Sequence, residues 1–408
     1  MKKILLLALS ALVCFLAVSC VHRDNGIYRS ESVESARADQ NKSALSDKIE
    51  EIKEEYVPKR VSFVAAGDNI VYYGNVLEAA SLSGDGERYD FSHQFQYIKD
   101  QISSSDVAFI NQETLTASSL PLEYYPRFNS PTEVVDCLIE VGFDVINIAN
   151  NHMLDHGISA LRESTDYLRQ NKQVFTVGAY YDEADYNDIR IYEHDGVKIA
   201  ILSYTEFTNM GRGGDTSSFC VPLLREDTLR EQIPLAKQVS DIVLVSVHWG
   251  NENSFETSVN QRRFASLMCE LGADVIIGHH PHVIQTIEWL QSDNGNRTLC
   301  AYSLGNLCAE MAEGKNMLGG LLSFDIVKYE EDTVAENVVF TPTVYYFNSR
   351  FKQNSVIYLD DFTEELASKH GISYYGNSVS LSELVSYLEK YIPSEFLPEN
   401  ISSSDMST

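Results

Sequence analysis

The sequence predicts an α/β fold in which a sandwich of mixed β-sheets is flanked by helices. The main observation is a repeated pattern in which an apolar run of strand length ends abruptly in polar residues. The runs occupy residues 61–66, 107–110, 145–149, 242–247 and 275–277, with a sixth at 301–304. Short runs that are apolar on both faces are typical of buried strands, and helical stretches between them indicate an α/β fold.

Two of the predicted helices have recognisable ends. Residues 130–133, Ser-Pro-Thr-Glu, form a predicted capping box, and Gly142 is expected to end the helix that follows them. Residues 261–271 are the second predicted helix, which Gly272 ends. Each helix lies between two of the apolar runs, as the connections between parallel strands require.

Other segments add antiparallel character to the predicted sheets. Residues 189–193 and 197–204 form a predicted hairpin that turns at residues 195–196, Asp-Gly. Late strands are expected near residues 321–327 and 338–346. A sandwich of mixed sheets therefore fits the pattern better than a single doubly wound sheet.

The beginning of the chain predicts export and a lipid anchor. Two lysines precede an apolar run over residues 4–18 that is too short to span a membrane, and Cys20 lies just beyond it. We interpret residues 1–20 as a secretory signal with a bacterial lipobox, in which Cys20 is acylated. The alternative is an ordinary signal followed by a chance cysteine. We expect an exported, membrane-anchored lipoprotein of the cell envelope, with residues 21–59 as a polar spacer.

The composition predicts a globular domain and argues against a nucleic-acid binder. The chain has 408 residues, of which 44% are hydrophobic, enough for a large buried core. Its formal net charge is -28, from 59 acidic and 31 basic residues, whereas binding to nucleic-acid phosphates needs an excess of Lys and Arg. The five cysteines after Cys20 lack the spacing of metal ligands, so we expect them to be small buried residues. One disulfide bond among them stays an open alternative.

Five of the apolar runs end in residues that can bind a metal ion. These residues are Asp68, Glu113, Asn151, His152, His248, His280 and His282. In open α/β sheets, ligands bind beyond the carboxyl ends of the strands. A single aspartate at a strand end is ordinarily a turn or helix cap, but five such coincidences favour a site. Carboxylate, amide and imidazole ligands without thiolate suit Mn, Fe(II), Zn or Mg.

The predicted site can hold a pair of cations. A carboxylate bridges two cations that lie about 3.5–4 Å apart, and we assign that role to Glu113. Such a pair activates water and stabilises both the attacking and the leaving oxygen of a displacement. A histidine that is not a ligand can protonate the leaving group, and His152 is assigned that role. We therefore expect two divalent metal ions as cofactors.

Four sequence blocks resemble the signature of the CapA family. They are residues 150–157 (NNHMLDHG), 248–250 (HWG), 278–282 (GHHPH) and 303–306 (SLGN). This family contains the poly-γ-glutamate capsule synthesis proteins, and its domain is related to calcineurin-like metallophosphoesterases. Residues 67–68 (GD) and 111–113 (NQE) match its earlier blocks in the right order, and the resemblance covers roughly residues 61–310.

The resemblance implies a four-layer α/β/β/α sandwich of the metallophosphoesterase type, which we place over residues 60–348. The pattern of the residues after it predicts a small α/β extension with a frayed tail over residues 349–408. It also implies roles for individual residues. The implied metal ligands are Asp68, Glu113, Asn151, His248, His280 and His282. The implied catalytic residues are His152 and Asp155, the second of which is alternatively a supporting residue. Residues that contact the substrate or support the ligands are Asn111, His279, Trp249, Glu252 and Asn306.

Three positions depart from the related families. Residue 70 is Ile where classical phosphoesterases carry a His, and Glu113 stands in place of their bridging Asp. Asn253 follows Glu252 where an aromatic residue is usual in the CapA pattern. Phosphoesterase activity therefore does not follow from the resemblance alone. Trp249 fits either a substrate platform or a packing role.

The leading hypothesis is a lipid-anchored envelope protein that synthesises, exports or anchors a poly-γ-glutamate-like capsule polymer through a metal-dependent hydrolase or transfer site. Its partners are the anionic polymer or a phosphoester substrate, the membrane and other capsule-synthesis proteins. The net charge of -28 repels an anionic polymer unless cations offset it. Two alternatives stay open: a metal-dependent phosphoesterase or amide hydrolase with another envelope substrate, and a non-enzymatic binding lipoprotein.

Overall fold

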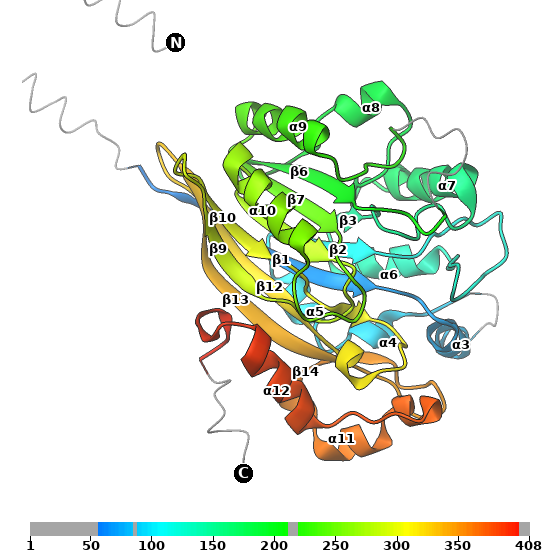
Figure 1. Cartoon of the computed structure of the whole chain (residues 1–408). Coiled ribbons are helices and arrows are strands. Elements are labelled where there is room, and N and C mark those ends of the chain that lie inside the picture. Colours follow the sequence, from blue (N-terminus) through cyan, green and yellow to red (C-terminus); the bar gives the residue numbers. More distant parts are fainter. Residues whose placement is uncertain (1–55, 85–87, 211–218, 400–408) are drawn as a thin grey trace, which may run out of the picture. The chain divides into compact units, whose positions relative to one another are not determined.

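Two β-sheets pack face to face at the centre of the computed structural model (Figure 1). The structure describes residues 56–84, 88–210 and 219–399, and residues 57–408 form one unit. The predicted signal peptide, its lipidation site Cys20 and the spacer up to residue 55 lie outside the described residues. In the described part of the chain, no helix is long and apolar enough to cross a membrane.

The first sheet is 8-stranded and has the order β14-β13-β12-β1-β2-β3-β4, with β11 paired to β1. Neighbours from β1 to β4 are parallel, whereas β12, β13 and β14 add antiparallel pairs. Its strands are β1 (Lys59–Asn69), β2 (Val107–Gln112), β3 (Val145–Asn147), β4 (Phe175–Val177), β11 (Asn306–Cys308), β12 (Leu318–Lys328), β13 (Thr333–Tyr346) and β14 (Ser355–Tyr358).

The second sheet is 6-stranded and has the order β5-β6-β7-β8-β10-β9. Its four central strands are parallel, and β5 and β9 pair antiparallel at the two edges. Its strands are β5 (Ile191–His194), β6 (Val197–Thr205), β7 (Ile242–His248), β8 (Val275–His279), β9 (Ile287–Gln291) and β10 (Arg297–Ala301).

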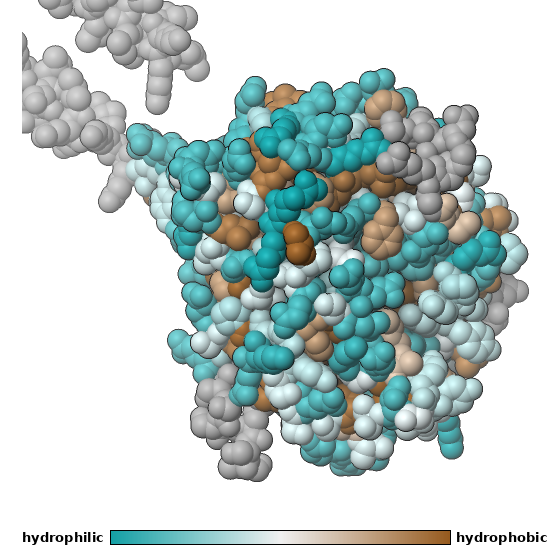
Figure 2. Space-filling view, viewed as in Figure 1, coloured by the Kyte–Doolittle hydropathy of each residue, from teal (hydrophilic) through white to brown (hydrophobic). Residues whose placement is uncertain are grey.

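Helices cover the outer faces of the two sheets (Figure 1). Helices α9 and α10 contact strands of the second sheet, and α4 and α7 contact strands of the first. The described helices are α3 (Tyr73–Leu82), α4 (Ser92–Phe95), α5 (Lys99–Ser103), α6 (Glu133–Val141), α7 (Gly157–Gln170), α8 (Glu183–Asn187), α9 (Glu226–Val239), α10 (Val259–Leu271), α11 (Glu364–Lys369) and α12 (Leu381–Tyr391). Figure 2 shows a mainly hydrophilic surface on this side, with scattered apolar residues.

The two packed layers explain why the predicted strands are apolar on both faces. In β6, Ile199 and Ile201 belong to the core that both sheets share, whereas Ala200 and Leu202 belong to a second core with residues of α9 and α10. Successive side chains of a strand point to opposite faces, so a strand between two apolar layers has no polar face. The predicted α/β fold with mixed sheets and flanking helices is confirmed.

The predicted hairpin and most helix ends are also confirmed. β5 and β6 pair antiparallel across a turn in which Asp195 and Gly196 have φ angles of 50° and 75°, as a two-residue hairpin turn requires. Gly142 and Gly272 end α6 and α10 in the left-handed conformation. The five cysteines from Cys137 to Cys308 are buried, and the described residues contain no disulfide.

The sixth predicted strand, at residues 301–304, is wrong. β10 ends at Ala301, and the chain there leaves the second sheet. Gly305 has a left-handed φ of 70°, and the next residues join the first sheet as β11, parallel to β1. The apolar residues in this run are therefore buried in a crossing between the sheets and not in a strand.

The predicted capping box at residues 130–133 is also wrong. Helix α6 begins at Glu133, and its N-cap residue Thr132 makes no side-chain cap. The hydroxyl of Ser130 donates instead to the hydroxyl oxygen of Thr114 at 2.8 Å. Ser130 therefore bonds to a residue distant in sequence and not to the backbone of the helix it precedes. The Ser-x-x-Glu pattern alone does not reveal this choice of partner.

The C-terminal extension is tied to the rest of the fold. β14 pairs antiparallel with β13, and Ser380 caps α12 by accepting a hydrogen bond from the backbone nitrogen of Glu383 at 3.2 Å. The ring of Tyr391 in α12 stacks on Phe255 with centroids 4.5 Å apart. The extension therefore packs on the loop that follows β7, while the domain boundary at residue 348 stays a prediction.

A buried carboxylate fastens α3 to the segment before β14. Glu78 accepts hydrogen bonds from the backbone nitrogens of Gln353 (2.5 Å) and Asn354 (2.7 Å) and from Nδ2 of Asn354 (2.7 Å). Tyr345 donates its hydroxyl to Oδ1 of Asn354 at 2.8 Å, which extends the network into β13. Loss of the carboxylate would leave buried donors without partners, the costly case for a hydrogen bond.

We predict that Glu78→Ala lowers the free energy of unfolding by about 3 kcal/mol, because two backbone donors and one amide donor lose their acceptor. Urea unfolding measures the change. The control is Glu365→Ala on α11, which removes an exposed ion pair with Lys369 and should leave the free energy of unfolding close to the wild-type value, because exposed ion pairs contribute little. Equal effects of the two substitutions would contradict the assigned role of Glu78.

Candidate functional site

The predicted site residues meet at the edge where the carboxyl ends of both sheets come together. Asp68 lies near the end of β1, Glu113 follows β2, and His248 ends β7. His280 and His282 follow β8, and Asn151 and His152 follow β3 by a few residues. All seven side chains are buried, with Asp68, Glu113, Asn151 and His248 fully inaccessible. The parallel strands of each sheet thus deliver their polar ends to one place, as the strand pattern predicted.

Two groups of side chains in this cluster could hold a cation. One contains Asp68, Glu113 and His248, and the other contains Glu113, His280 and His282. Within each group the ligand atoms lie within 4.8 Å of one another. Glu113 belongs to both groups, which is the arrangement that a bridging carboxylate needs.

Several polar side-chain atoms of the cluster have no hydrogen-bond partner among the described residues. Both carboxylate oxygens of Glu113 and Nδ1 of His248 and of His280 are buried in this state. A buried polar atom without a partner is costly, and a buried carboxylate is especially so. Carboxylate oxygen and imidazole nitrogen are ligands for Mn, Fe, Zn or Mg, and a cation would satisfy the carboxylate of Glu113. The residues present therefore fit a divalent metal ion.

The backbone after β8 is strained where it carries two of these ligands. His280 has a φ of 97° and His282 a φ of 56°, in the left-handed region that residues other than glycine seldom adopt. Strained residues of this kind cluster at active sites, where the surrounding structure holds them in place. The conformation turns both imidazoles into the cluster, with ring centroids 5.7 Å apart.

Asp68 is held by donors on both of its oxygens. Oδ1 accepts from Nδ2 of Asn111 at 2.8 Å, and Oδ2 accepts from the backbone nitrogen of His280 at 3.0 Å. Nδ1 of His279 lies 3.2 Å from Oδ1, and Nδ1 of His282 lies 3.4 Å from Oδ2. Burial raises the pKa of Asp68, but the hydrogen bonds and charges of His279 and His282 outweigh it and hold the pKa well below its usual value. Asp68 is therefore ionised.

Glu113 lies in the opposite environment. Burial raises its pKa well above the usual value, and the nearby charge of Asp68 adds to the effect, whereas His282 opposes it. The Nε2 atoms of His248 and His282 each lie 3.7 Å from Oε1 of Glu113, too far for a hydrogen bond. The protein thus supplies hydrogen-bond donors to the carboxylate of Asp68 and none to that of Glu113 among the described residues.

The histidines of the cluster differ in charge. Burial, with the repulsion of His282, lowers the pKa of His280 to about 3, and burial lowers that of His248 well below its usual value. Burial also lowers the pKa of His282, but Glu113 and Asp68 outweigh it and raise the pKa to about 9. His248 and His280 are therefore neutral, the state in which imidazole binds a metal ion.

His152 is oriented by a carboxylate behind it. Its Nδ1 lies 2.7 Å from Oδ2 of Asp155, which also accepts from the backbone nitrogen of Phe128 at 2.8 Å. The ring of Phe128 packs edge-on against His152 with centroids 4.8 Å apart. This geometry fixes the imidazole with Nδ1 toward Asp155 and leaves Nε2 as the atom that can transfer a proton.

Asn209 was not predicted from the sequence. Its Nδ2 lies 3.4 Å from Nε2 of His152, and its Oδ1 accepts from Nδ2 of Asn151 at 3.3 Å. Asn151 in turn places Oδ1 2.9 Å from Nε2 of His248. Asn209 lies at the edge predicted for the site because it follows β6, but it stands outside the apolar run and its neighbouring residues form no recognisable block.

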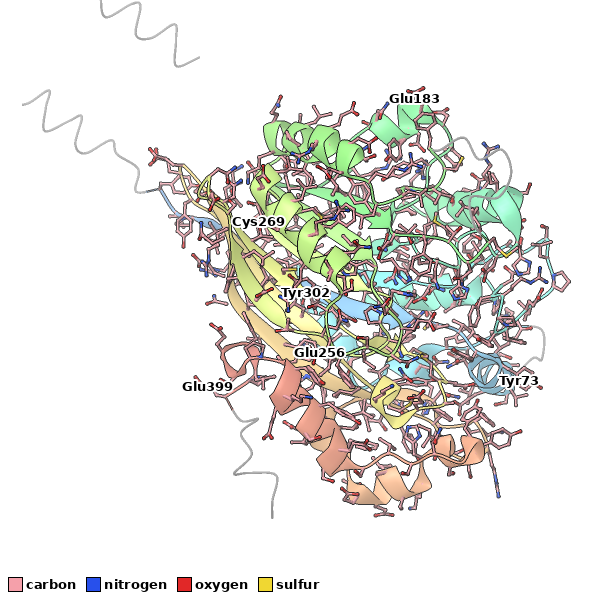
Figure 3. The ribbon with its side chains drawn as sticks, in the orientation of Figure 1. Tyr73, Glu183, Glu256, Cys269, Tyr302 and Glu399 are labelled. Atoms are coloured by element: carbon pink, nitrogen blue, oxygen red, sulfur yellow. The ribbon has the colours of Figure 1, made fainter. Side chains whose placement is uncertain are left out.

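The remaining predicted residues occupy different surroundings. Asn306 places Oδ1 3.0 Å from Nδ1 of His282, so it supports a ligand. Trp249 is fully buried, stacks on Tyr302 and donates from Nε1 to its carbonyl at 3.0 Å, which favours packing over substrate contact (Tyr302 is labelled in Figure 3). His279 stacks on Phe109. Glu252 lies exposed on the loop after β7.

We predict that Mn²⁺ stabilises the wild-type protein and not Glu113→Gln. A ligand at 100 times its dissociation constant raises the free energy of unfolding by about 2.7 kcal/mol. The glutamine amide retains the size of Glu113 but removes the charge on which both groups depend. Thermal unfolding with and without Mn²⁺ measures the shift, and Glu256→Gln on the exposed loop is the control. An equal shift in Glu113→Gln would contradict the assigned ligands.

The chain matches known proteins over the region that builds this site. Residues 62–311 match the family model described as Bacterial capsule synthesis protein PGA_cap. PGA biosynthesis protein CapA of Bacillus subtilis (strain 168) is 30% identical over 262 residues, which cover 63% of this chain and 67% of that protein. Capsule biosynthesis protein CapA of Bacillus anthracis is 28% identical over 242 residues, which cover 57% of each chain.

Solved structures show a more distant likeness. The calcineurin-like phosphoesterase YfkN from Bacillus subtilis aligns with a TM-score of 0.43 and 13% sequence identity, covering 70% of this chain and 91% of that chain. The 5'-nucleotidase precursor from Thermus thermophilus aligns with a TM-score of 0.42 and 10% identity, covering 81% of this chain and 59% of that chain. On the strength of the family match over residues 62–311, the chain belongs to the bacterial capsule synthesis protein PGA_cap family.

Proposed function

We propose that this protein acts at the cell envelope in the synthesis, export or anchoring of a poly-γ-glutamate-like capsule polymer, and that its buried cluster carries out a metal-dependent hydrolysis or transfer step. The family match and the names of the two CapA relatives support the capsule role. Other capsule-synthesis proteins are the expected partners. A further relative from Mycobacterium tuberculosis, 27% identical over 199 residues, is named a probable polyglutamine synthesis accessory protein.

The single observation that carries the metal-dependent step is Glu113. Its buried carboxylate belongs to both groups of ligands, and neither oxygen has a hydrogen-bond partner among the described residues. A folded protein tolerates such a group when a cation compensates it. We propose two divalent ions here, of Mn, Fe, Zn or Mg, with Asp68, Asn151, His248, His280 and His282 as the other ligands.

The residues around the cluster supply the rest of the chemistry. Bound cations would act as Lewis acids that activate water and stabilise developing negative charge. His152, oriented through Nδ1 by Asp155, would use Nε2 to give a proton to the leaving nitrogen of a cleaved γ-amide. Phe128 and Asn209 confine the imidazole to this orientation. Burial of the cluster restricts water and strengthens each of these electrostatic interactions.

The charge of the protein bears on how it would bind an anionic polymer. With a net charge of -28 the chain repels polyglutamate at long range. Cations at the cluster would offset the carboxylates there and provide local positive charge. The affinity for the polymer should therefore fall when the metal is removed. A metal with a purely structural role would not produce this dependence.

We predict that the Mn²⁺-loaded full chain cleaves poly-γ-glutamate into shorter oligomers, and that His152→Ala lowers the rate by about 10²–10⁴-fold, the usual contribution of a general acid. New amine termini measure the reaction. His93→Ala in α4, where the imidazole contacts Gln96 and none of the cluster residues in the described hydrogen bonds, is the matched control and should retain the wild-type rate.

Two other outcomes would redirect the proposal. Turnover of a generic phosphoester without release of glutamate oligomers would identify a phosphoesterase with another envelope substrate. Binding of poly-γ-glutamate with no turnover of either compound, unchanged by His152→Ala, would identify a non-enzymatic binding lipoprotein.

We also propose that Cys20 carries the lipid that holds the protein at the membrane. A mature chain anchored by acyl groups gains about 0.8 kcal/mol for each buried CH₂, so more than one chain gives stable attachment. In an expression host that processes lipoproteins, we expect the wild type in the membrane fraction and Cys20→Ser in the soluble fraction. Cofractionation of both with membranes would contradict acylation at Cys20.

A further inference from the structure

We propose that Asn147 is a positioning residue for Asp68, which it orients through Asn111 by a one-way chain of hydrogen bonds. The inference rests on the proposed metal site, because Asp68 matters here as a metal ligand. Asn147 is fully buried at the end of β3. Its side chain is hydrogen-bonded to Asn111, Ala149 and Ser203, none of which is a proposed metal ligand.

The chain of hydrogen bonds runs across three neighbouring strands of the first sheet. Asp68, Asn111 and Asn147 are register partners on β1, β2 and β3, so their side chains lie side by side. Nδ2 of Asn147 donates to Oδ1 of Asn111 at 2.8 Å, and Nδ2 of Asn111 donates to Oδ1 of Asp68 at 2.8 Å. The hydroxyl of Ser203, on β6 of the second sheet, donates to Oδ1 of Asn147. All four side chains are buried.

A backbone N–H group sets the direction in which these hydrogen bonds donate. The nitrogen of Ala149 donates to Oδ1 of Asn147 at 3.1 Å, and a backbone N–H can only donate. The oxygen of the Asn147 amide must therefore face Ala149, and its NH₂ must face Asn111. The Asn111 amide is then forced to accept on one side and to donate to Asp68 on the other. The carboxylate of Asp68 thus always meets a donor.

Gly178 packs closely against the oxygen end of the Asn147 amide. Gly178, just after β4, has a φ of 95°, and a Cβ atom there would lie 2.5 Å from both Oδ1 of Asn147 and the nitrogen of Ala149. Only glycine fits this position, so the backbone after β4 can approach the amide oxygen of Asn147 closely. The oxygen and the NH₂ of an amide are nearly the same size, so the orientation of Asn147 is set by the backbone donor of Ala149 and not by the available space.

The consequence is a ligand that is oriented before a cation binds. Asn111 fixes Oδ1 of Asp68, and the backbone nitrogen of His280 fixes Oδ2 at 3.0 Å. Partners that orient ligands in this way typically contribute 10–100-fold to metal affinity. Two hydrogen bonds separate Asn147 from Asp68, so Asn147 would not touch a bound cation. Its role should therefore appear as a change in metal affinity when Asn147 is replaced.

The test is Asn147→Asp in the full chain, with Mn²⁺ affinity measured by calorimetric titration. The substitution keeps the size of the side chain and its acceptor for Ala149, but replaces the donor toward Asn111 with a second acceptor. Asn111 must then turn, and its oxygen meets Asp68. We expect Mn²⁺ affinity to fall by about 10–100-fold. Ser203→Ala should have a small effect, because Ala149 still sets the direction.

Controls separate positioning from stability and from the metal site itself. Asn354→Ala removes a buried amide far along the chain, and it should lower stability in urea without changing Mn²⁺ affinity. If Asn147→Asp does not fold, Asn147→Ala takes its place. Wild-type affinity in a folded Asn147 variant would overturn the inference, whereas absence of Mn²⁺ binding by the wild type would overturn the proposed metal site instead.

Discussion

The burial of two carboxylates side by side at the joint edge of the sheets is the constraint on which the rest of the structure depends. Asp68 and Glu113 are both fully inaccessible, and an ionised carboxylate without partners is among the most costly groups to bury. The protein satisfies Asp68 with donors from Asn111 and from the backbone of His280. It leaves Glu113 without a donor, so the two acids are treated in opposite ways. The divalent ions proposed for this cluster would account for that difference.

Several irregular features of the fold occur at this same edge. The chain after β8 takes left-handed conformations at His280 and His282, and the chain after β10 leaves the second sheet through Gly305 to join the first. The loop after β7 is held by the C-terminal extension, where Phe255 packs between the tyrosines of α12. Regular strands build the two walls of the site, while these crossings and strained residues place its ligands.

The sequence predicted which residues gather at the carboxyl edge of the sheets, but it did not predict which hydrogen bonds their side chains make. Asp68, Glu113 and His248 end apolar runs, so strand periodicity alone placed them together. Asn147 lies inside such a run, and its role depends on Ala149 and on the close approach of Gly178, neither of which has a periodic signal. Asn209 and the hydroxyl partner of Ser130 are tertiary contacts as well. Periodicity reports which face a residue occupies, but hydrogen-bond direction depends on neighbours that are distant in sequence.

The most direct test of a metal centre shared by Asp68 and Glu113 is anomalous scattering from crystals of the protein grown with Mn²⁺. We expect anomalous peaks within the cluster, with the Glu113 carboxylate in contact with them and the Asp68 carboxylate still held by Asn111. Crystals that show no peak in the cluster, with Glu113 paired instead to a hydrogen-bond donor of the protein, would contradict this expectation.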